Sequence, residues 1–272
     1  MGCYLRPRGL EEAVAALADG SYSVLAGGTD FYPARAGGLA GRAPDTNILD
    51  ITALPDLRGI TEDDGAFRLG ALTTWSDVLR APLPPCFTAL KLAAREVGGV
   101  QIQNAGTLAG NLCNASPAAD GTPPVLALNG EIEIAALDGE TVVRRSMPVA
   151  DFVKGPSRTD LQPGEIVTAL TCDSLEGYGG AFEKVGQRRS LVISSVCAVA
   201  CIKTDTAGEI FEDVRLALGG IGPVPVRLSD IEDMLKGQRI SRELITEASA
   251  IPPARVASRS RQDYRRAVVR GF

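Results

Sequence analysis

A segment of small and polar residues carries the strongest sign of ligand chemistry in this sequence. Residues 101–120 have the sequence QIQNAGTLAGNLCNASPAAD, with residues 107–111 (TLAGN) at its centre. Small side chains leave peptide N–H groups uncovered, and threonine and asparagine add neutral hydrogen-bonding groups. Ser116 and Pro117 are typical of a helix start, and free N–H groups before a helix favour an anion. The segment therefore predicts an anion-binding loop; a glycine turn before a helix is the alternative.

A second segment of the same kind follows a short apolar run. Residues 23–26 (SVLA) are consistent with a buried strand, and residues 27–30 (GGTD) come directly after it. Two glycines followed by threonine and aspartate, both good N-cap residues, predict another phosphate-type loop. Neither segment has the spacing GxGxxG or GxxxxGK[ST], which argues against Rossmann and P-loop sites. Two such loops in one chain suit a ligand with a pyrophosphate centre and long arms, such as a dinucleotide.

Taken together, these segments resemble a known family. AGGTD at residues 26–30, followed by residues 101–120, is similar to the FAD-binding (medium) subunit of molybdenum hydroxylases, the xanthine dehydrogenase / carbon monoxide dehydrogenase flavoprotein family. The resemblance covers nearly the whole chain and includes YLRP at 4–7, LGALTT at 69–74, FEK at 182–184 and ALGGIGP at 217–223. It implies an α+β fold, in which a PCMH/vanillyl-alcohol-oxidase-type FAD-binding fold of two α/β subdomains precedes a small C-terminal domain of antiparallel sheet and helices.

The resemblance also implies which residues hold FAD. The two loops would contact the pyrophosphate largely through main chain, and Asp120 matches an acidic residue that binds the flavin cofactor. Leu161 matches an apolar position near the ring system, with ordinary packing as the alternative. Lys184 matches a lysine close to the flavin, where a cation would stabilise the anionic reduced form; an exposed strand lysine is the alternative. The expected cofactor-binding residues are Leu25, Ala26, Gly27, Gly28, Thr29, Asp30, Thr107, Leu108, Ala109, Gly110, Asn111, Asp120, Leu161 and Lys184.

Two positions depart from the family pattern. Many relatives have arginine where this chain has Gln103, and glycine where it has Ala109. Gln103 removes a positive charge near the cofactor. Alanine at position 109 is tolerated unless that residue needs a positive φ, for which glycine is strongly preferred. We expect FAD binding to persist despite both changes.

The resemblance implies an electron-transfer subunit of an oxidoreductase complex. A large partner subunit would carry the molybdenum cofactor and a small one the [2Fe-2S] clusters, with two heterotrimers forming a dimer. This chain would take electrons from those clusters onto FAD and pass them to NAD+, oxygen or another acceptor. It would supply no catalytic residue and no metal ligand. The alternatives are a stand-alone FAD-dependent oxidoreductase and a flavin-free scaffold subunit, for which Gln103 and Ala109 are the only support.

Composition argues against several other classes of function. The 272 residues include no histidine, which excludes a histidine general base or a histidine-activated nucleophile. A net charge of −5 argues against nucleic acid or an anionic membrane as a partner. Six cysteines without a CxxC pair indicate buried free thiols in a reducing compartment. We expect a cytoplasmic chain, because neither a signal peptide nor an apolar run of about 20 residues is present.

The expected domains are an N-terminal FAD-binding α/β subdomain (1–55), a middle FAD-binding subdomain (56–170) and a C-terminal α+β domain (171–272). Hydrophobic period and capping residues predict helices at 10–18, 31–36 (closed by Gly37 and Gly38), 74–79, 88–97, 122–128, 229–235 (capped by Ser229), 241–250 and 262–269. Strands are expected at 23–26, 47–51, 66–72, 131–136, 141–145, 180–185, 196–204 and 211–218. Six arginines between residues 255 and 270 suit a solvated helix face or, alternatively, an acidic partner.

Overall fold

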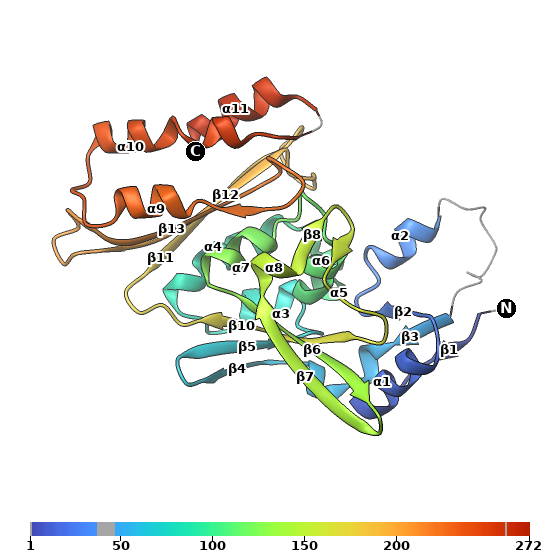
Figure 1. The fold of residues 1–272 in the computed structure, drawn as a ribbon. Coiled ribbons are helices and arrows are strands. Elements are labelled where there is room, and N and C mark those ends of the chain that lie inside the picture. Colours follow the sequence, from blue (N-terminus) through green and yellow to red (C-terminus); the bar gives the residue numbers. More distant parts are fainter. Residues whose placement is uncertain (1, 37–46, 259) are drawn as a thin grey trace.

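The computed structural model describes residues 2–36, 47–258 and 260–272. The helix stop expected at Gly37 and Gly38 lies outside these residues. Within the described residues, the strands form three sheets and one short two-stranded pair. Figure 1 shows the sheets in sequence order across the molecule, from the N-terminal elements in blue, through the central sheet, to the C-terminal strands and helices in orange and red.

The N-terminal sheet is parallel and has the order β1 (Tyr4–Leu5), β3 (Asn47–Asp50), β2 (Tyr22–Leu25). Helix α1 (Leu10–Asp19) connects β1 to β2 and buries Leu10, Ala13 and Val14, the spacing of one helix face. Helix α2 (Phe31–Ala36) follows β2, and two single 3-10 turns (Ile51–Ala53 and Pro55–Leu57) lead to the next sheet. Both strands and both helices predicted here are confirmed, but β2 is not a fully buried strand, because Val24 is exposed and only Leu25 is buried.

The central sheet is antiparallel, in the order β4 (Ile60–Asp63), β5 (Ala66–Gly70), β10 (Ile166–Asp173), β6 (Glu131–Asp138), β7 (Thr141–Pro148). Ile132 and Ile134 on β6 are buried while Glu131 is exposed, as the alternating pattern predicted. Gly139, with φ of +61°, closes the β6–β7 hairpin. The short pair β8 (Val153–Gly155) and β9 (Arg158–Thr159) precedes β10.

A group of short helices lies between β5 and β8. They are α3 (Trp75–Arg80), α4 (Thr88–Glu96), α5 (Val100–Ala105), α6 (Leu108–Asn114), α7 (Thr122–Ala127) and α8 (Val149–Phe152), with a 3-10 turn at Pro85–Phe87. Thr74 and Asp77 form a reciprocal capping box at the start of α3. Among the described residues, no helix is both long and apolar enough to cross a membrane.

One expected helix start in this group is wrong. Ser116 and Pro117 lie in a turn, and the chain around them forms helices α6 and α7 instead. Thr107 caps α6, because its Oγ1 accepts from the Gly110 N–H at 3.0 Å. Ala115, with φ of +48°, ends α6 in the left-handed conformation. The small residues at 108–111 are helical, and Gly106 lies between α5 and α6.

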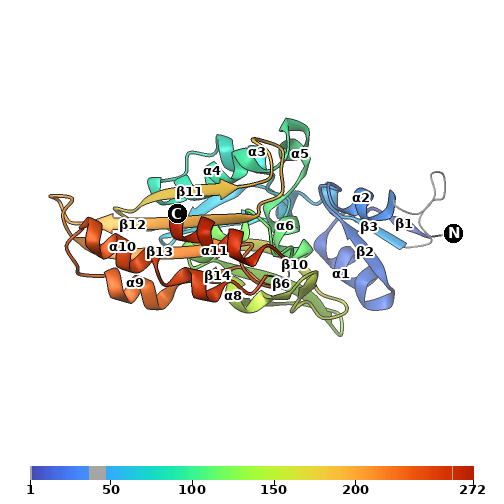
Figure 2. The same cartoon turned by 90° about the horizontal axis from the view of Figure 1, so that it is seen from above.

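The C-terminal sheet is antiparallel, with the order β11 (Gly179–Val185), β12 (Val196–Thr204), β13 (Phe211–Gly219), β14 (Val226–Arg227). Helices α9 (Ser229–Leu235), α10 (Arg242–Ser249) and α11 (Gln262–Gly271), with a 3-10 turn at Pro252–Arg255, lie over one face (Figure 1, Figure 2). Ser229 is the first residue of α9 rather than its cap, a position that Leu228 takes without a side-chain hydrogen bond.

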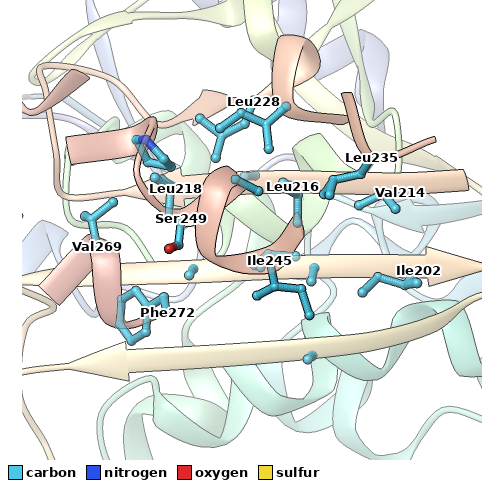
Figure 3. Close-up of a pocket in the computed structure, with 18 of the residues that line it drawn as sticks. Ile202, Val214, Leu216, Leu218, Leu228, Leu235, Ile245, Ser249, Val269 and Phe272 are labelled. Atoms are coloured by element: carbon cyan, nitrogen blue, oxygen red, sulfur yellow. The ribbon is translucent and has the colours of Figure 1, made fainter. Parts of the chain in front are cut away.

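Two hydrophobic cores hold these layers together. The larger core joins Leu49 of the N-terminal sheet, Ile132 of the central sheet and Val199 of the C-terminal sheet. The smaller core lies between the C-terminal sheet and its helices, where apolar side chains surround a cavity of about 290 Å³ (Figure 3). The domain boundaries expected after residues 55 and 170 stay predictions, and β10 runs to Asp173.

The arginines near the C-terminus have partners within the chain. The Arg265 guanidinium donates to the carbonyl oxygens of Ser195 and Gly220, which ties α11 to the segment that precedes β12. Arg255 pairs with Asp230, and Arg266 pairs with Asp263 at 3.0 Å. These contacts within the chain explain three of the arginines without an acidic partner protein.

Candidate functional site

The two glycine-containing loops meet through their main chains. An ideal Cβ on Gly27 would lie 1.9 Å from the carbonyl oxygen of Ala105 and 2.9 Å from Gly106 Cα. A Cβ on Gly106 would lie 3.1 Å from Thr29 Oγ1. Gly28 has φ of +74°, which strongly favours glycine. The small residues of both segments are therefore needed because the two loops pack against each other at backbone distance.

A third segment holds the second loop in place. The Trp75 N–H donates to the Gly106 carbonyl at 3.2 Å, and the Leu108 N–H donates to the Thr73 carbonyl at 3.0 Å. Thr74 forms an isolated antiparallel bridge with Thr107. The C-terminal end of the LGALTT segment (residues 69–74) therefore holds the residues at the start of α6 in place.

Both loops line one cavity of about 590 Å³. Its lining residues come mainly from the β2–α2 segment, from α5 and α6, and from the connection before β10. This volume falls within the range of small-molecule and cofactor sites. The expected cofactor-binding residues that line it are Ala26, Gly27, Gly28, Thr29, Asp30, Thr107, Ala109, Gly110, Asn111 and Leu161.

Four expected residues do not line the cavity. Leu25 and Leu108 are buried in the core behind the loops. Lys184 and Asp120 form an ion pair of 2.6 Å whose side chains are 5% and 9% exposed. The alternative of an exposed strand lysine is therefore wrong for Lys184.

The ion pair is connected to the rim of the cavity. Lys184 Nζ also donates to the Glu96 carbonyl at 3.1 Å, and the Asp120 carboxylate accepts from the Ser194 hydroxyl. Ile193, next to Ser194, lines the cavity. On the other side of Asp120, the Gly121 N–H donates to Asn111 Oδ1 at 3.2 Å. The buried ion pair of Asp120 and Lys184 thus connects the wall of the cavity that contains Ile193 to the wall that contains Asn111.

Several lining residues were not among those expected. Cys113 and Asn114 lie one helical turn beyond Gly110 and Asn111 on α6, so helical spacing could have found them. The others come from separate elements, and no local pattern marks them. They are Val24, Phe31, Ala34, Ile51, Ala71, Trp75, Val97, Gly98, Ile102, Glu165, Ile166, Val167 and Ile193.

Charge in the cavity decides how an anion could be held. Among the described residues that line it, Asp30 and Glu165 carry carboxylates and none is a lysine or arginine. A pyrophosphate would therefore depend on main-chain N–H groups and on neutral side chains such as those of Thr29 and Asn111. In the second loop, the N–H groups of Leu108, Gly110 and Asn111 already donate within the chain, which leaves those of Thr107 and Ala109 for a ligand.

Ala109 and Gln103, the two departures from the family pattern, both fit their positions in the structure. Ala109 lies inside α6 with helical backbone, where alanine is the most favourable residue, so no positive φ is required. Gln103 lies on α5, and its Nε2 donates to the Arg95 carbonyl at 3.1 Å, which joins α5 to α4. Neither residue blocks the cavity.

Bound FAD is expected to protect Cys113 from alkylation. This thiol is half-buried in the cavity wall, and desolvation raises its pKa to about 12, so it should react slowly even without cofactor. With FAD bound, its alkylation rate should fall several-fold further. Mass spectrometry of iodoacetamide-treated protein would measure both rates, with the exposed Cys3 as internal control. Equal Cys113 rates with and without FAD would contradict a cofactor in this cavity.

Comparisons with known proteins show the family of this chain. The family described as "FAD binding domain in molybdopterin dehydrogenase" matches residues 1–172, and "CO dehydrogenase flavoprotein C-terminal domain" matches residues 181–272. The glyceraldehyde dehydrogenase medium chain of Sulfolobus acidocaldarius is 31% identical, over 98% of this chain and 94% of its own length. The xanthine dehydrogenase FAD-binding subunit of Escherichia coli O157:H7 is also 31% identical, over 94% and 87% respectively.

Solved structures show the same fold. Carbon monoxide dehydrogenase from Hydrogenophaga pseudoflava contains a chain that is 25% identical, with a TM-score of 0.89 over 99% of this chain and 93% of that chain. The fold is therefore α+β, with the predicted FAD-binding domain followed by the C-terminal domain. This chain belongs to the FAD-binding (medium) subunits of the molybdenum hydroxylases, the oxidoreductase family of xanthine dehydrogenase and carbon monoxide dehydrogenase.

Proposed function

We propose that this chain carries electrons within a multi-subunit molybdenum hydroxylase. It would receive them from [2Fe-2S] clusters of a small partner subunit and pass them to NAD+, oxygen or another acceptor. A large partner subunit with the molybdenum cofactor would hydroxylate the organic substrate. The observation that carries the proposal is the main-chain contact of two glycine-containing loops on one cavity, in a chain of this family.

The residues of the cavity suggest how FAD is held. Bound FAD would supply the redox chemistry, because it can exchange electrons both singly and in pairs. Residues 26–30, together with the N–H groups of Thr107 and Ala109 and the side chain of Asn111, would hold the pyrophosphate. Leu161 would pack against the ring system. Asp120 and Lys184 would fix the cavity walls from behind, rather than contact the pyrophosphate. No described residue needs to act as an acid, a base or a nucleophile in this role.

The assembly is proposed from relatives. Medium-chain names among the relatives support partner subunits of other sizes, and the Hydrogenophaga pseudoflava structure is named with a molybdenum cofactor. The iron–sulfur subunit is proposed from the family resemblance. A dimer of such heterotrimers in the cytoplasm remains our prediction. Among the described residues, no group of three or more cysteine, aspartate, glutamate or histidine side chains is arranged to hold a metal ion. The proposal assigns the metal centres to the partners because the family resemblance implies it.

An assay of the chain with and without its partners tests this division of work. The chain freed of partner subunits and loaded with FAD should not hydroxylate aldehydes or azaheterocycles, but its chemically reduced flavin should be reoxidised by NAD+ or oxygen. The native complex should hydroxylate one of these substrates and should contain molybdenum and iron. Hydroxylation by the chain alone would contradict the proposal and favour a stand-alone oxidoreductase.

A further inference from the structure

The connection between β9 and β10 carries two residues of the cavity wall. Leu161 and Glu165 both line the cavity, and Gly164 between them has φ of +87°. Residues 160–165 form no helix or strand. The Asp160 N–H donates to the Phe152 carbonyl at 2.9 Å and the Glu165 N–H to the Gln162 carbonyl at 3.1 Å, and side chains supply the other contacts. Their strongest contacts come from one residue of a different strand, Arg145 on β7.

Arg145 binds both ends of this connection. Its Nε and one terminal nitrogen donate to the two carboxylate oxygens of Glu165, at 2.7 and 2.8 Å. The same terminal nitrogen donates to the Asp160 carbonyl at 3.1 Å and to the Asp160 carboxylate at 3.3 Å. A planar guanidinium that binds a carboxylate through two parallel bonds fixes direction as well as distance.

Glu165 in turn closes the loop on itself. Its carboxylate accepts from the Gln162 N–H at 2.8 Å, and its side chain is 11% exposed. The hydrogen bonds from Arg145 lower the pKa of Glu165, so the group is a carboxylate at neutral pH. A carboxylate in the wall of a cavity for an anionic cofactor would repel the pyrophosphate unless a nearby cation balances it. Arg145 supplies that cation from outside the cavity lining.

We propose that Arg145 and Glu165 form a clamp that holds residues 160–165, and with them Leu161, in position against FAD. Arg145 is thus a positioning residue, which neutralises the Glu165 carboxylate and orders the loop without touching the cofactor. This inference rests on the proposed cofactor site. It predicts that the clamp controls FAD affinity more than the stability of the sheet.

The chain provides a matched control beside the clamp. Arg144 precedes Arg145 on β7, so its side chain points to the opposite face of the strand. It forms a single ion pair of 3.0 Å with Glu133, which also binds Arg68. Glu133 does not line the cavity. Loss of Arg144 removes the same charge from the protein but leaves the clamp intact.

The test compares FAD dissociation constants and amide hydrogen exchange of Arg145→Met, Glu165→Gln, the double variant and Arg144→Met. The protein is purified natively by a tag on this chain, with its partner subunits, and titrated with FAD after the cofactor is removed. Arg145→Met should weaken FAD binding at least about tenfold, because the Glu165 carboxylate in the cavity wall loses its balancing cation. Arg144→Met should weaken it less than about twofold. The amides of residues 160–162, 164 and 165 should exchange several-fold faster in Arg145→Met and Glu165→Gln, and at the wild-type rate in Arg144→Met.

The double variant separates a clamp from two independent effects. Because the two residues act as a unit, it should bind FAD no more weakly than Arg145→Met alone. If Arg145→Met does not fold, Arg145→Lys, which keeps the charge but loses the paired bonds, should still accelerate exchange of the loop. FAD affinity of Arg145→Met equal to that of Arg144→Met, or unchanged exchange of the loop, would overturn the clamp alone. A wild-type protein that binds no FAD would overturn the proposed function and the clamp with it.

Discussion

Replacement of Lys184 by methionine is expected to destabilise the protein by about 3–5 kcal/mol, the range for breaking a buried ion pair from one side. Asp120 would keep only the Ser194 hydroxyl as a side-chain partner, and its side chain is 9% exposed. The uncompensated carboxylate would either draw water into the core or separate β11 from the turn after α6. Urea denaturation of wild type and variant would measure the change in unfolding free energy.

Two comparisons show whether burial of the ion pair causes that loss. The double variant Lys184→Met with Asp120→Asn removes both charges and should recover a large part of the stability. Lys203→Met breaks the ion pair between Lys203 and Glu212, whose side chains are 40% and 44% exposed. This variant should lose less than about 1 kcal/mol of unfolding free energy. A loss from Lys184→Met as small as that from Lys203→Met would show that the pair is not buried in solution.

Gly27→Ala is expected to abolish retention of FAD. The new methyl group would lie 1.9 Å from the Ala105 carbonyl oxygen, so the two loops must separate. Such overpacking costs about 1–3 kcal/mol of stability, and separation of the loops would also disrupt the N–H groups that we assign to the pyrophosphate. FAD per chain after gel filtration of natively purified protein measures the effect.

Gly179→Ala is the control for this substitution. Gly179 begins β11, has no positive φ, and an added Cβ would meet no atom within 4 Å. The control variant should retain as much FAD as the wild type. Retention of FAD by Gly27→Ala at the wild-type level would contradict the assignment of the cofactor to the junction of the two loops.

Local patterns predicted most of the elements because the determinants of those elements are local. The β6–β7 hairpin follows from alternating residues and a turn glycine, and α1 follows from one apolar face. The helix start predicted at Ser116 and Pro117 is wrong because another helix N-cap lies earlier in the chain. Thr107 caps a helix earlier, and that helix must end at Ala115 before α7 can begin.

Only the two loops of the site could be predicted from the sequence. Small residues marked both loops because close backbone packing requires them, and their contact is what the structure adds. Lys184 and Asp120 were each expected beside the flavin, but their pairing joins residues on separate elements and leaves no trace in local sequence. The same holds for Ile193 and Glu165, which reach the cavity only through the tertiary fold.

The most direct test of the account is a visible absorption spectrum of the natively purified protein, with FAD, molybdenum and iron measured on the same sample. We predict flavin bands, one FAD for each copy of this chain, and molybdenum and iron that co-purify with it. Flavin without metals would contradict the electron-transfer role in a molybdenum hydroxylase. A colourless protein that takes up no added FAD would contradict the cofactor site itself.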